Sequence, residues 1–216
     1  MSLIKRFGRV ALILVVGLAC LWLFTTLAAA ITENAWIVEF DQALATQLYA
    51  TATPLSIAIF TLITWLGYPV GWIVIIVVAL YFVRQRQWWD ATLWLVATIS
   101  GELLMNAFKA FYDRPRPVFE IPLTTALNTS FPSGHAMQSL IVYGLLAYFL
   151  VTNTNNLRLR IWIIFGAVLL VLLIGMSRLF LGVHYLSDVL GGFAAGALWL
   201  IICTAVLEFV HGRRRS

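Results

Sequence analysis

Long apolar stretches constrain this chain more than any other feature. They lie at about residues 8–31, 55–83, 88–111, 136–152, 160–177 and 185–207. A helix of about 20 residues crosses the hydrocarbon core of a bilayer, so each stretch can span a membrane. The 216 residues are 62% hydrophobic and only 11% charged, which excludes an ordinary soluble domain. We therefore predict an all-α, polytopic membrane protein, a bundle of six transmembrane helices that forms a single domain over residues 1–216.

The first two stretches have unusual features. Lys5, Arg6 and Arg9 stand at the start of the stretch at about 8–31, as in a signal peptide, but the stretch is longer than a signal sequence needs, which favours an uncleaved anchor. Gly67 and Pro69 interrupt the second stretch and predict a shallow helix that leads into a shorter span. Between the two, residues 32–54 mix acidic and large apolar residues, a pattern typical of a helix at the membrane interface.

The fourteen Lys and Arg residues fall into two groups on either side of the membrane. By the positive-inside rule the larger group marks the cytoplasm, so we predict a multi-pass protein of the inner (plasma) membrane with both termini cytoplasmic. The smaller group lies at the opposite, extracytoplasmic face, where a bound anion would explain it. The ten predicted cytoplasmic cations are Lys5, Arg6, Arg9, Arg84, Arg86, Arg158, Arg160, Arg213, Arg214 and Arg215; the other four are Lys109, Arg114, Arg116 and Arg178.

Neither the net charge nor the cysteines indicate another class of partner. The charge of +5 comes from cations scattered between apolar segments, so no nucleic-acid binding is predicted. Cys20 and Cys203 lie inside apolar stretches without the spacing of metal ligands or of a disulfide framework. The expected partner at this point is the lipid bilayer, and the oligomeric state stays open.

Three polar segments at the predicted outer face together suit a phosphate group, and they are residues 109–117, 132–135 and 177–188. Lys109, Arg116 and Arg178 can surround its oxygens with charge-assisted hydrogen bonds. Ser133 and Gly134 add a hydroxyl and a backbone N–H at the start of a helix, where anions are favoured. Singly, each of these residues has an ordinary structural interpretation as a membrane anchor, a turn or a helix cap. Their coincidence at one face favours an anion site.

Two histidines complete the predicted site. His184 and Asp188 are four residues apart, so on a helix they share a face, and the carboxylate can hold the imidazole in the tautomer whose other nitrogen attacks. His135 is then available as the acid. The site offers no ligand cage for a divalent metal, so activity without metal is expected.

These residues match the three-part pattern of the type 2 phosphatidic acid phosphatase (PAP2) superfamily, K-x6-RP, PSGH and SR-x5-H-x3-D, over a motif core at about 105–190. The six-span layout resembles the branch that contains bacterial phosphatidylglycerophosphatase B and undecaprenyl-diphosphatase. The resemblance implies a phosphohistidine on His184 supported by Asp188, protonation of the leaving group by His135, and no cofactor. It implies phosphate binding by Lys109, Arg116, Ser133, Gly134 and Arg178.

The expected activity is hydrolysis of a lipid phosphomonoester or diphosphate. Phosphatidylglycerol phosphate, phosphatidate and undecaprenyl diphosphate all stay open as substrates. Phosphotransfer to another lipid is the alternative, because a phosphohistidine can be discharged by any admitted nucleophile. The hydropathy disfavours a soluble vanadium haloperoxidase, and charges gathered at one face disfavour a channel or carrier.

Several polar residues outside the pattern have open roles. Glu102 and Asn106 lie on the same helical face as Lys109, and they make a structural contact or position Lys109 or the lipid headgroup. Asp113 and Arg114 are expected to pair with each other or with water. Residues 128–130 match a glycosylation triplet, interpreted as a chance match. Loop 118–131 is expected to dip toward the headgroups through Val118, Phe119, Ile121, Leu123 and Leu127.

Overall fold

The computed structural model describes residues 3–33, 35–126 and 129–214, and the regular structure within these ranges is helical. Six segments are long and apolar enough to cross a membrane, the second being α3 and α4 together. The predicted six-span, all-α fold is confirmed. The helices are α1 (Leu3–Glu33), α2 (Ala35–Ala50), α3 (Pro54–Gly67), α4 (Pro69–Arg84), α5 (Trp88–Tyr112), α6 (Gly134–Thr152), α7 (Leu157–Phe180) and α8 (Leu186–Arg214).

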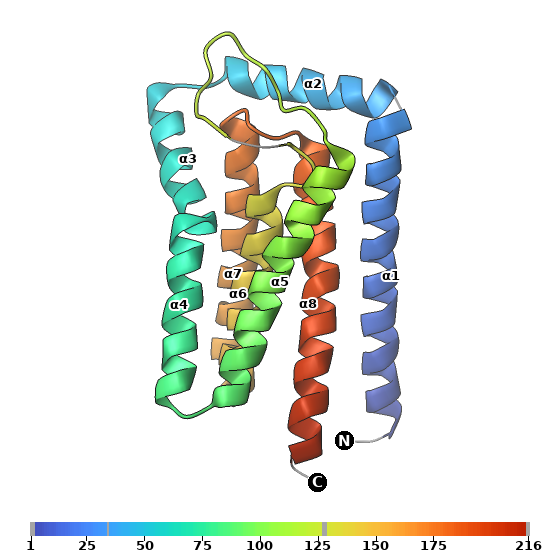
Figure 1. The fold of residues 1–216 in the computed structure, drawn as a ribbon, viewed down its shortest axis with the longest axis vertical. Helices are drawn as coiled ribbons and strands as arrows, with labels where there is room; N and C mark the ends of the chain where they lie inside the picture. The colour runs from blue at the N-terminus through green and yellow to red at the C-terminus, as the bar shows by residue number, and fades with distance from the viewer. Residues whose placement is uncertain (1–2, 34, 127–128, 215–216) are drawn as a thin grey trace.

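Helix α2 lies across one end of the bundle, roughly perpendicular to the spans (Figure 1). Its inner face buries Asp41 and Ala45, whereas Trp36 and Phe40 are exposed. Tryptophan is enriched at membrane–water interfaces, so this placement agrees with the interfacial helix predicted within residues 32–54.

The second span is broken where the sequence predicts it. Helix α3 ends at Gly67, and α4 begins at Pro69, whose missing N–H would be unsatisfied in a first turn in any case. The expectation of a shallow helix is wrong, because α3 runs in the same direction as α4 along the side of the bundle (Figure 1). A side chain at position 67 would come within 2.5 Å of Ile174 Cγ2, so glycine allows α3 to approach α7 closely.

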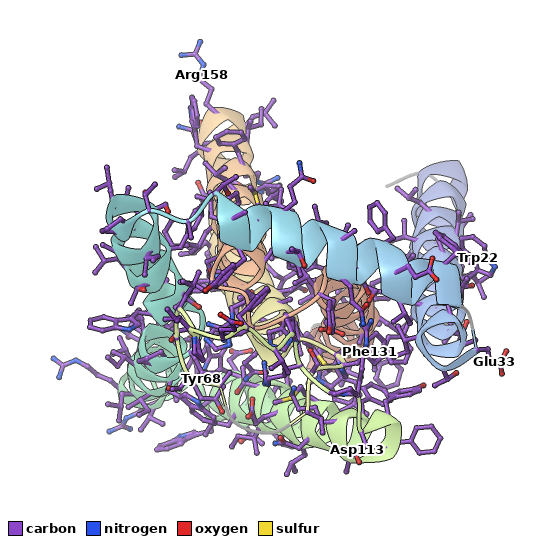
Figure 2. All side chains as sticks on the ribbon, turned by 90° about the horizontal axis from the view of Figure 1, so that it is seen from above. Trp22, Glu33, Tyr68, Asp113, Phe131 and Arg158 are labelled. Atoms are coloured by element: carbon purple, nitrogen blue, oxygen red, sulfur yellow. The ribbon has the colours of Figure 1, made fainter. Side chains whose placement is uncertain are left out.

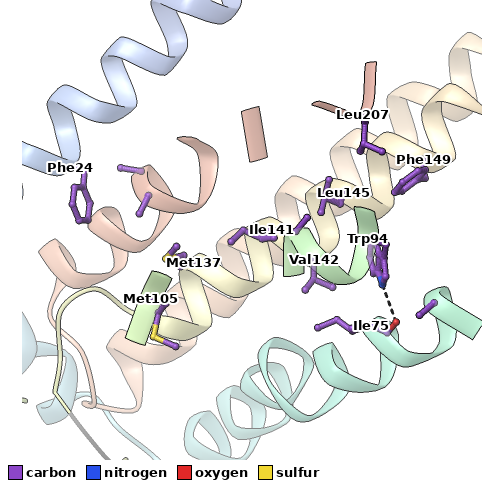
Figure 3. Packing of buried hydrophobic residues seen from close by; sticks show 14 of the residues in the cluster. Phe24, Ile75, Trp94, Met105, Met137, Ile141, Val142, Leu145, Phe149 and Leu207 are labelled. Atoms are coloured by element: carbon purple, nitrogen blue, oxygen red, sulfur yellow. Dashed lines mark hydrogen bonds between the residues drawn. The ribbon is translucent and has the colours of Figure 1, made fainter. Parts of the chain in front are cut away.

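Helix α6 is the centre of the bundle and packs against α8, α7 and α5. Ile141 and Leu145 are fully buried on it, and Trp94 of α5 donates a hydrogen bond to the Ile75 carbonyl of α4 at 2.9 Å (Figure 3). Lipid tails are as apolar as these side chains, so close packing and interhelical hydrogen bonds hold the helices together. Gly192 brings α8 near the start of α6, since a Cβ there would lie 2.6 Å from the Ser133 carbonyl oxygen.

The connections separate into two ends, as the cation pattern predicts. The start of α1, the α4–α5 and α6–α7 connections and the end of α8 lie at one end, and α2 and the α5–α6 connection lie at the other (Figure 1). The second end carries the four other cations: Lys109 at the end of α5, Arg114 and Arg116 in the α5–α6 connection, and Arg178 at the end of α7. Which end faces the cytoplasm stays a prediction.

Candidate active site

The three polar segments meet beneath α2. Lys109 lies in the last turn of α5, Ser133 precedes the first residue of α6, and Asp188 lies in the first turn of α8. Backbone hydrogen bonds join the segments: the Ser133 N–H donates to the Asp188 carbonyl at 2.9 Å, and the Ser130 N–H donates to the Arg114 carbonyl at 2.7 Å. The polar groups are therefore held by main-chain contacts as well as by side chains.

A cavity of about 450 Å³ lies at this end of the bundle, next to the break between α3 and α4. Among the predicted site residues, Ser133 and Asp188 lie outside its lining, and both are fully buried behind it. The predicted residues that line it are Lys109, Arg116, Gly134, His135, Arg178 and His184.

His184 has different partners on its two ring nitrogens. Nε2 lies 3.0 Å from Nη1 of Arg116, and Nδ1 lies 3.4 Å from Oδ2 of Asp188. A guanidinium can only donate, so Nε2 is the acceptor and the ring proton belongs on Nδ1, facing the carboxylate. Burial lowers the pKa of His184 to about 3, against the opposing effect of Asp188. The imidazole is thus neutral, with the lone pair of Nε2 toward the cavity and the cations.

Ser130 is a site residue that the sequence interpretation missed. Its hydroxyl donates a hydrogen bond to Oδ2 of Asp188 and lies 3.4 Å from Nδ1 of His184. The Tyr185 N–H donates to the same Oδ2 at 2.8 Å. Ser130 belongs to the triplet interpreted as a chance match, and its position three residues before Ser133 was the available signal.

Arg114 and Asp41 form a second group behind Asp188. Arg114 donates from Nη1 to Oδ1 of Asp188 at 2.7 Å and from Nη2 to Oδ2 of Asp41 at 2.8 Å. Ser187 donates to Asp41 through its hydroxyl and its N–H. The expected pairing of Arg114 with Asp113 or water is wrong, because the chain returns over α8 and buries the guanidinium between two carboxylates. No sequence spacing connects Asp41 to this region.

The three predicted phosphate-binding cations contact neutral oxygens. Lys109 Nζ donates to the Thr129 carbonyl at 2.5 Å, Arg116 Nη2 donates to the same carbonyl at 3.2 Å, and Arg178 Nη1 donates to the Thr64 hydroxyl at 2.7 Å. In the described part of the chain, Lys109 and Arg178 have no carboxylate within ion-pair distance. Buried positive charge without a paired carboxylate fits an anion as the missing partner.

Two buried polar atoms beside the cations also have no partner among the described residues. They are the hydroxyl oxygen of Ser133 and Nε of Arg178. Buried polar groups are nearly always hydrogen-bonded, so each exception calls for a ligand or another explanation. The chemistry of the donor set fits a tetrahedral oxyanion, and the roles of these residues stay predictions.

His135 lines the same cavity as His184. Its ring stacks on Tyr68, with the ring centroids 5.3 Å apart, and a side chain at position 67 would lie 3.1 Å from its Cδ2. The break between α3 and α4 therefore shapes the wall that holds the predicted acid. In the end-on view, Tyr68 lies near the turn between α3 and α4, on the far side from α1 (Figure 2).

Loop 118–131 packs partly on α2 instead of only reaching outward. Phe119 stacks on Tyr49 with centroids 4.1 Å apart, and the Tyr49 hydroxyl donates to the Ile121 carbonyl at 2.9 Å. Val118 and Ile121 are largely exposed, which fits contact with headgroups. The prediction for Leu127 lies outside the described residues.

No group of three His, Cys, Asp or Glu side chains within the described ranges can hold a metal ion. Of the two histidines of the site, His184 contacts Arg116 through Nε2, and the ring of His135 stacks on Tyr68. Activity without a metal stays a prediction.

Known proteins match this chain over most of its length. The model of the PAP2 superfamily matches residues 90–211. Phosphatidylglycerophosphatase B of Bacillus subtilis (strain 168) is 38% identical over 199 residues, which cover 89% of this chain and 95% of that protein. The crystal structure of a transmembrane PAP2 type phosphatidylglycerolphosphate phosphatase from Bacillus subtilis matches with a TM-score of 0.83 and 33% identity, over 90% of this chain and 96% of that one. Aquifex aeolicus LpxE shares the fold, with a TM-score of 0.60 and 22% identity over 77% of this chain and 95% of that one. The chain therefore belongs to the PAP2 superfamily, as a membrane lipid phosphatase.

Proposed function

We propose that this phosphatase removes the terminal phosphate of phosphatidylglycerol phosphate at the extracytoplasmic face, through a phosphohistidine on His184. The observation that carries the proposal is the orientation of His184: Nδ1 faces Asp188, and Nε2 faces Arg116 inside a cavity with two further cations. The similarity to phosphatidylglycerophosphatase B supports the choice of lipid.

In the first step, Nε2 of His184 attacks phosphorus and the bond from phosphorus to the lipid oxygen breaks. The Nδ1 proton stays with the imidazole, and Asp188 stabilises the cation that develops. His135 gives a proton to the leaving alkoxide, which departs as a neutral alcohol. Lys109, Arg116 and Arg178 stabilise the charge on the transferring phosphoryl oxygens.

In the second step, water attacks the phosphohistidine and the P–N bond breaks. His135, now neutral, accepts the proton of the water, so inorganic phosphate leaves and both histidines return to their starting states. Transfer to a lipid hydroxyl would use the same intermediate. The assay therefore has to count phosphorylated lipid products as well as free phosphate.

Phosphate release from purified protein in detergent tests the activity. Phosphatidylglycerol phosphate, phosphatidate and undecaprenyl diphosphate form the panel, with His184→Ala as the blank and His211→Ala, near the far end of α8, as the matched histidine control. We expect the highest kcat/KM on phosphatidylglycerol phosphate. When the reaction with phosphatidylglycerol phosphate labelled in its terminal phosphate is quenched rapidly, the His211→Ala control should carry an acid-labile, alkali-stable phosphoryl label. The His184→Ala protein should carry none. Label in the His184→Ala protein would refute the proposed nucleophile.

A further inference from the structure

The proposed mechanism leaves one carboxylate of the cavity without a task. Glu102 lies on α5 and lines the same cavity as His135 and His184. Its Oε1 accepts a hydrogen bond from the Tyr68 hydroxyl at 2.9 Å, and its Oε2 is buried without any partner among the described residues. An unsatisfied carboxylate oxygen inside a membrane span is costly, which indicates a ligand that donates to it.

The position of Glu102 relates it to the leaving group rather than to the phosphate. It precedes Lys109 by seven residues, or about 10 Å along the helix, so the phosphate cradle lies at one end of the cavity and the carboxylate lies deeper. The Tyr68 ring connects the two regions, because it stacks on His135 and its hydroxyl binds Glu102. The group that accepts a proton from His135 would therefore extend toward Glu102.

We infer that Glu102 is a specificity-determining residue that accepts a hydrogen bond from a free hydroxyl on the leaving alcohol. This inference rests on the proposed function. The substrate class is then a lipid phosphate whose phosphate is esterified to a polyol, as in a glycerol phosphate headgroup. Glu102 supplies the acceptor, and the substrate hydroxyl supplies the donor that Oε2 lacks.

The same carboxylate disfavours the other two lipid classes. The leaving group of a diphosphate is itself an anion, and it would be repelled by Glu102 in a site shielded from water. The leaving group of phosphatidate is a diacylglycerol whose other oxygens are esterified, so it has no hydroxyl to donate. A polyol phosphate is the class that satisfies both ends of the cavity.

A matched pair of lipids tests this inference. One is phosphatidylglycerol phosphate, and the other is the phosphate ester of phosphatidyl-1,3-propanediol, which lacks only the free hydroxyl. The readout is the ratio of the two kcat/KM values in one preparation, which does not depend on the fraction of folded protein. A hydrogen bond to a charged group predicts a ratio of about 10 to 100 for the unmodified protein.

The variants separate recognition from a structural role. We expect the ratio to fall to about 1 in Glu102→Ala and to an intermediate value in Glu102→Gln, whose amide oxygen can still accept. Glu33→Gln, the same change at an exposed carboxylate at the end of α1, should keep the original ratio. Glu102→Gln should also raise kcat/KM for undecaprenyl diphosphate relative to phosphatidylglycerol phosphate, because the repulsion is removed.

Two results overturn the inference about Glu102: a ratio of about 1 in the unmodified protein, or an unchanged ratio in Glu102→Ala. A fall in the relative rate on undecaprenyl diphosphate in Glu102→Gln would contradict it as well. Failure of the proposed function looks different, since neither lipid of the pair would then release phosphate above the His184→Ala blank.

Discussion

Replacement of Arg114 by methionine should be among the most destabilising single changes in this protein. The guanidinium is only 7% exposed and lies between Asp41, at 2% exposure, and Asp188, at 0%. Methionine has a similar length and fills the space, but it leaves two carboxylates buried without their shared cation. The test is therefore of charge compensation and not of a cavity.

The structure allows the size of the effect to be worked out. Removal of one partner from a buried ion pair costs about 3–5 kcal/mol, and Arg114 compensates two carboxylates, so we expect the upper end, about 5 kcal/mol. For a protein of this length each kcal/mol lowers the melting temperature by about 2–4 °C, which gives a fall of about 10–20 °C. We also expect kcat to fall in this variant, because Asp188 loses its 2.7 Å hydrogen bond from Arg114.

Thermal unfolding in detergent, followed by tryptophan fluorescence, measures this effect. Arg84→Met, at an exposed arginine in the last turn of α4, is the matched control and should melt like the unmodified protein. Adding Asp41→Asn to Arg114→Met removes one uncompensated charge, so the double variant should be more stable than the sum of the single losses predicts. A melting temperature of Arg114→Met within about 2 °C of the control, or strictly additive losses, would refute the reasoning.

Further predictions concern acid–base chemistry, metals and topology. Burial lowers the pKa of His184 to about 3, below the unfolded value of about 6.5, so stability should fall as pH drops from 6.5 toward 3, and His184→Asn should flatten the dependence of melting temperature on pH. His135→Ala should lower kcat by about 10²- to 10⁴-fold on phosphatidate and less on undecaprenyl diphosphate, whose leaving phosphate needs no proton; equal losses would remove His135 as the acid. EDTA should leave the rate of phosphate release unchanged, whereas loss of activity restored by a metal would contradict this expectation. Topology can be tested with single cysteines in a background without Cys20 and Cys203. A cysteine at exposed Thr125 should react with an impermeant thiol reagent from outside, and one at exposed Asn155 should not; Asn155 is used because Asn156 caps α7. Reversed labelling would invert the predicted topology.

The sequence predicted the spans well because the bilayer imposes a length and a polarity on each of them. Gly67 and Pro69 also indicated the break in the second span. The direction of α3 could not be predicted, because it depends on packing against Ile174 of α7, and local sequence carries no information about that contact.

The candidate site divides in the same way. Motif residues such as His184 and Arg178 could be gathered because topology brings the ends of alternate spans to one face. Ser130 and Asp41 could not, because each reaches Asp188 or Arg114 through a turn or an interfacial helix whose placement is set by tertiary contacts. The protonation of His184 was also beyond the sequence, since burial outweighs the adjacent carboxylate.

The contact between α2 and the start of α8 has a consequence for biosynthesis. Asp41 and Ser187 are separated by 146 positions, so the ribosome makes the carboxylate long before its partner. A fragment limited to residues 90–211, the region that the superfamily model matches, would keep every motif residue and still lack Asp41. We therefore expect the minimal active unit to be larger than the motif region. Asp41 can meet Ser187 only after the last span has been made, so this contact forms late, when the N-terminal helices are already in place.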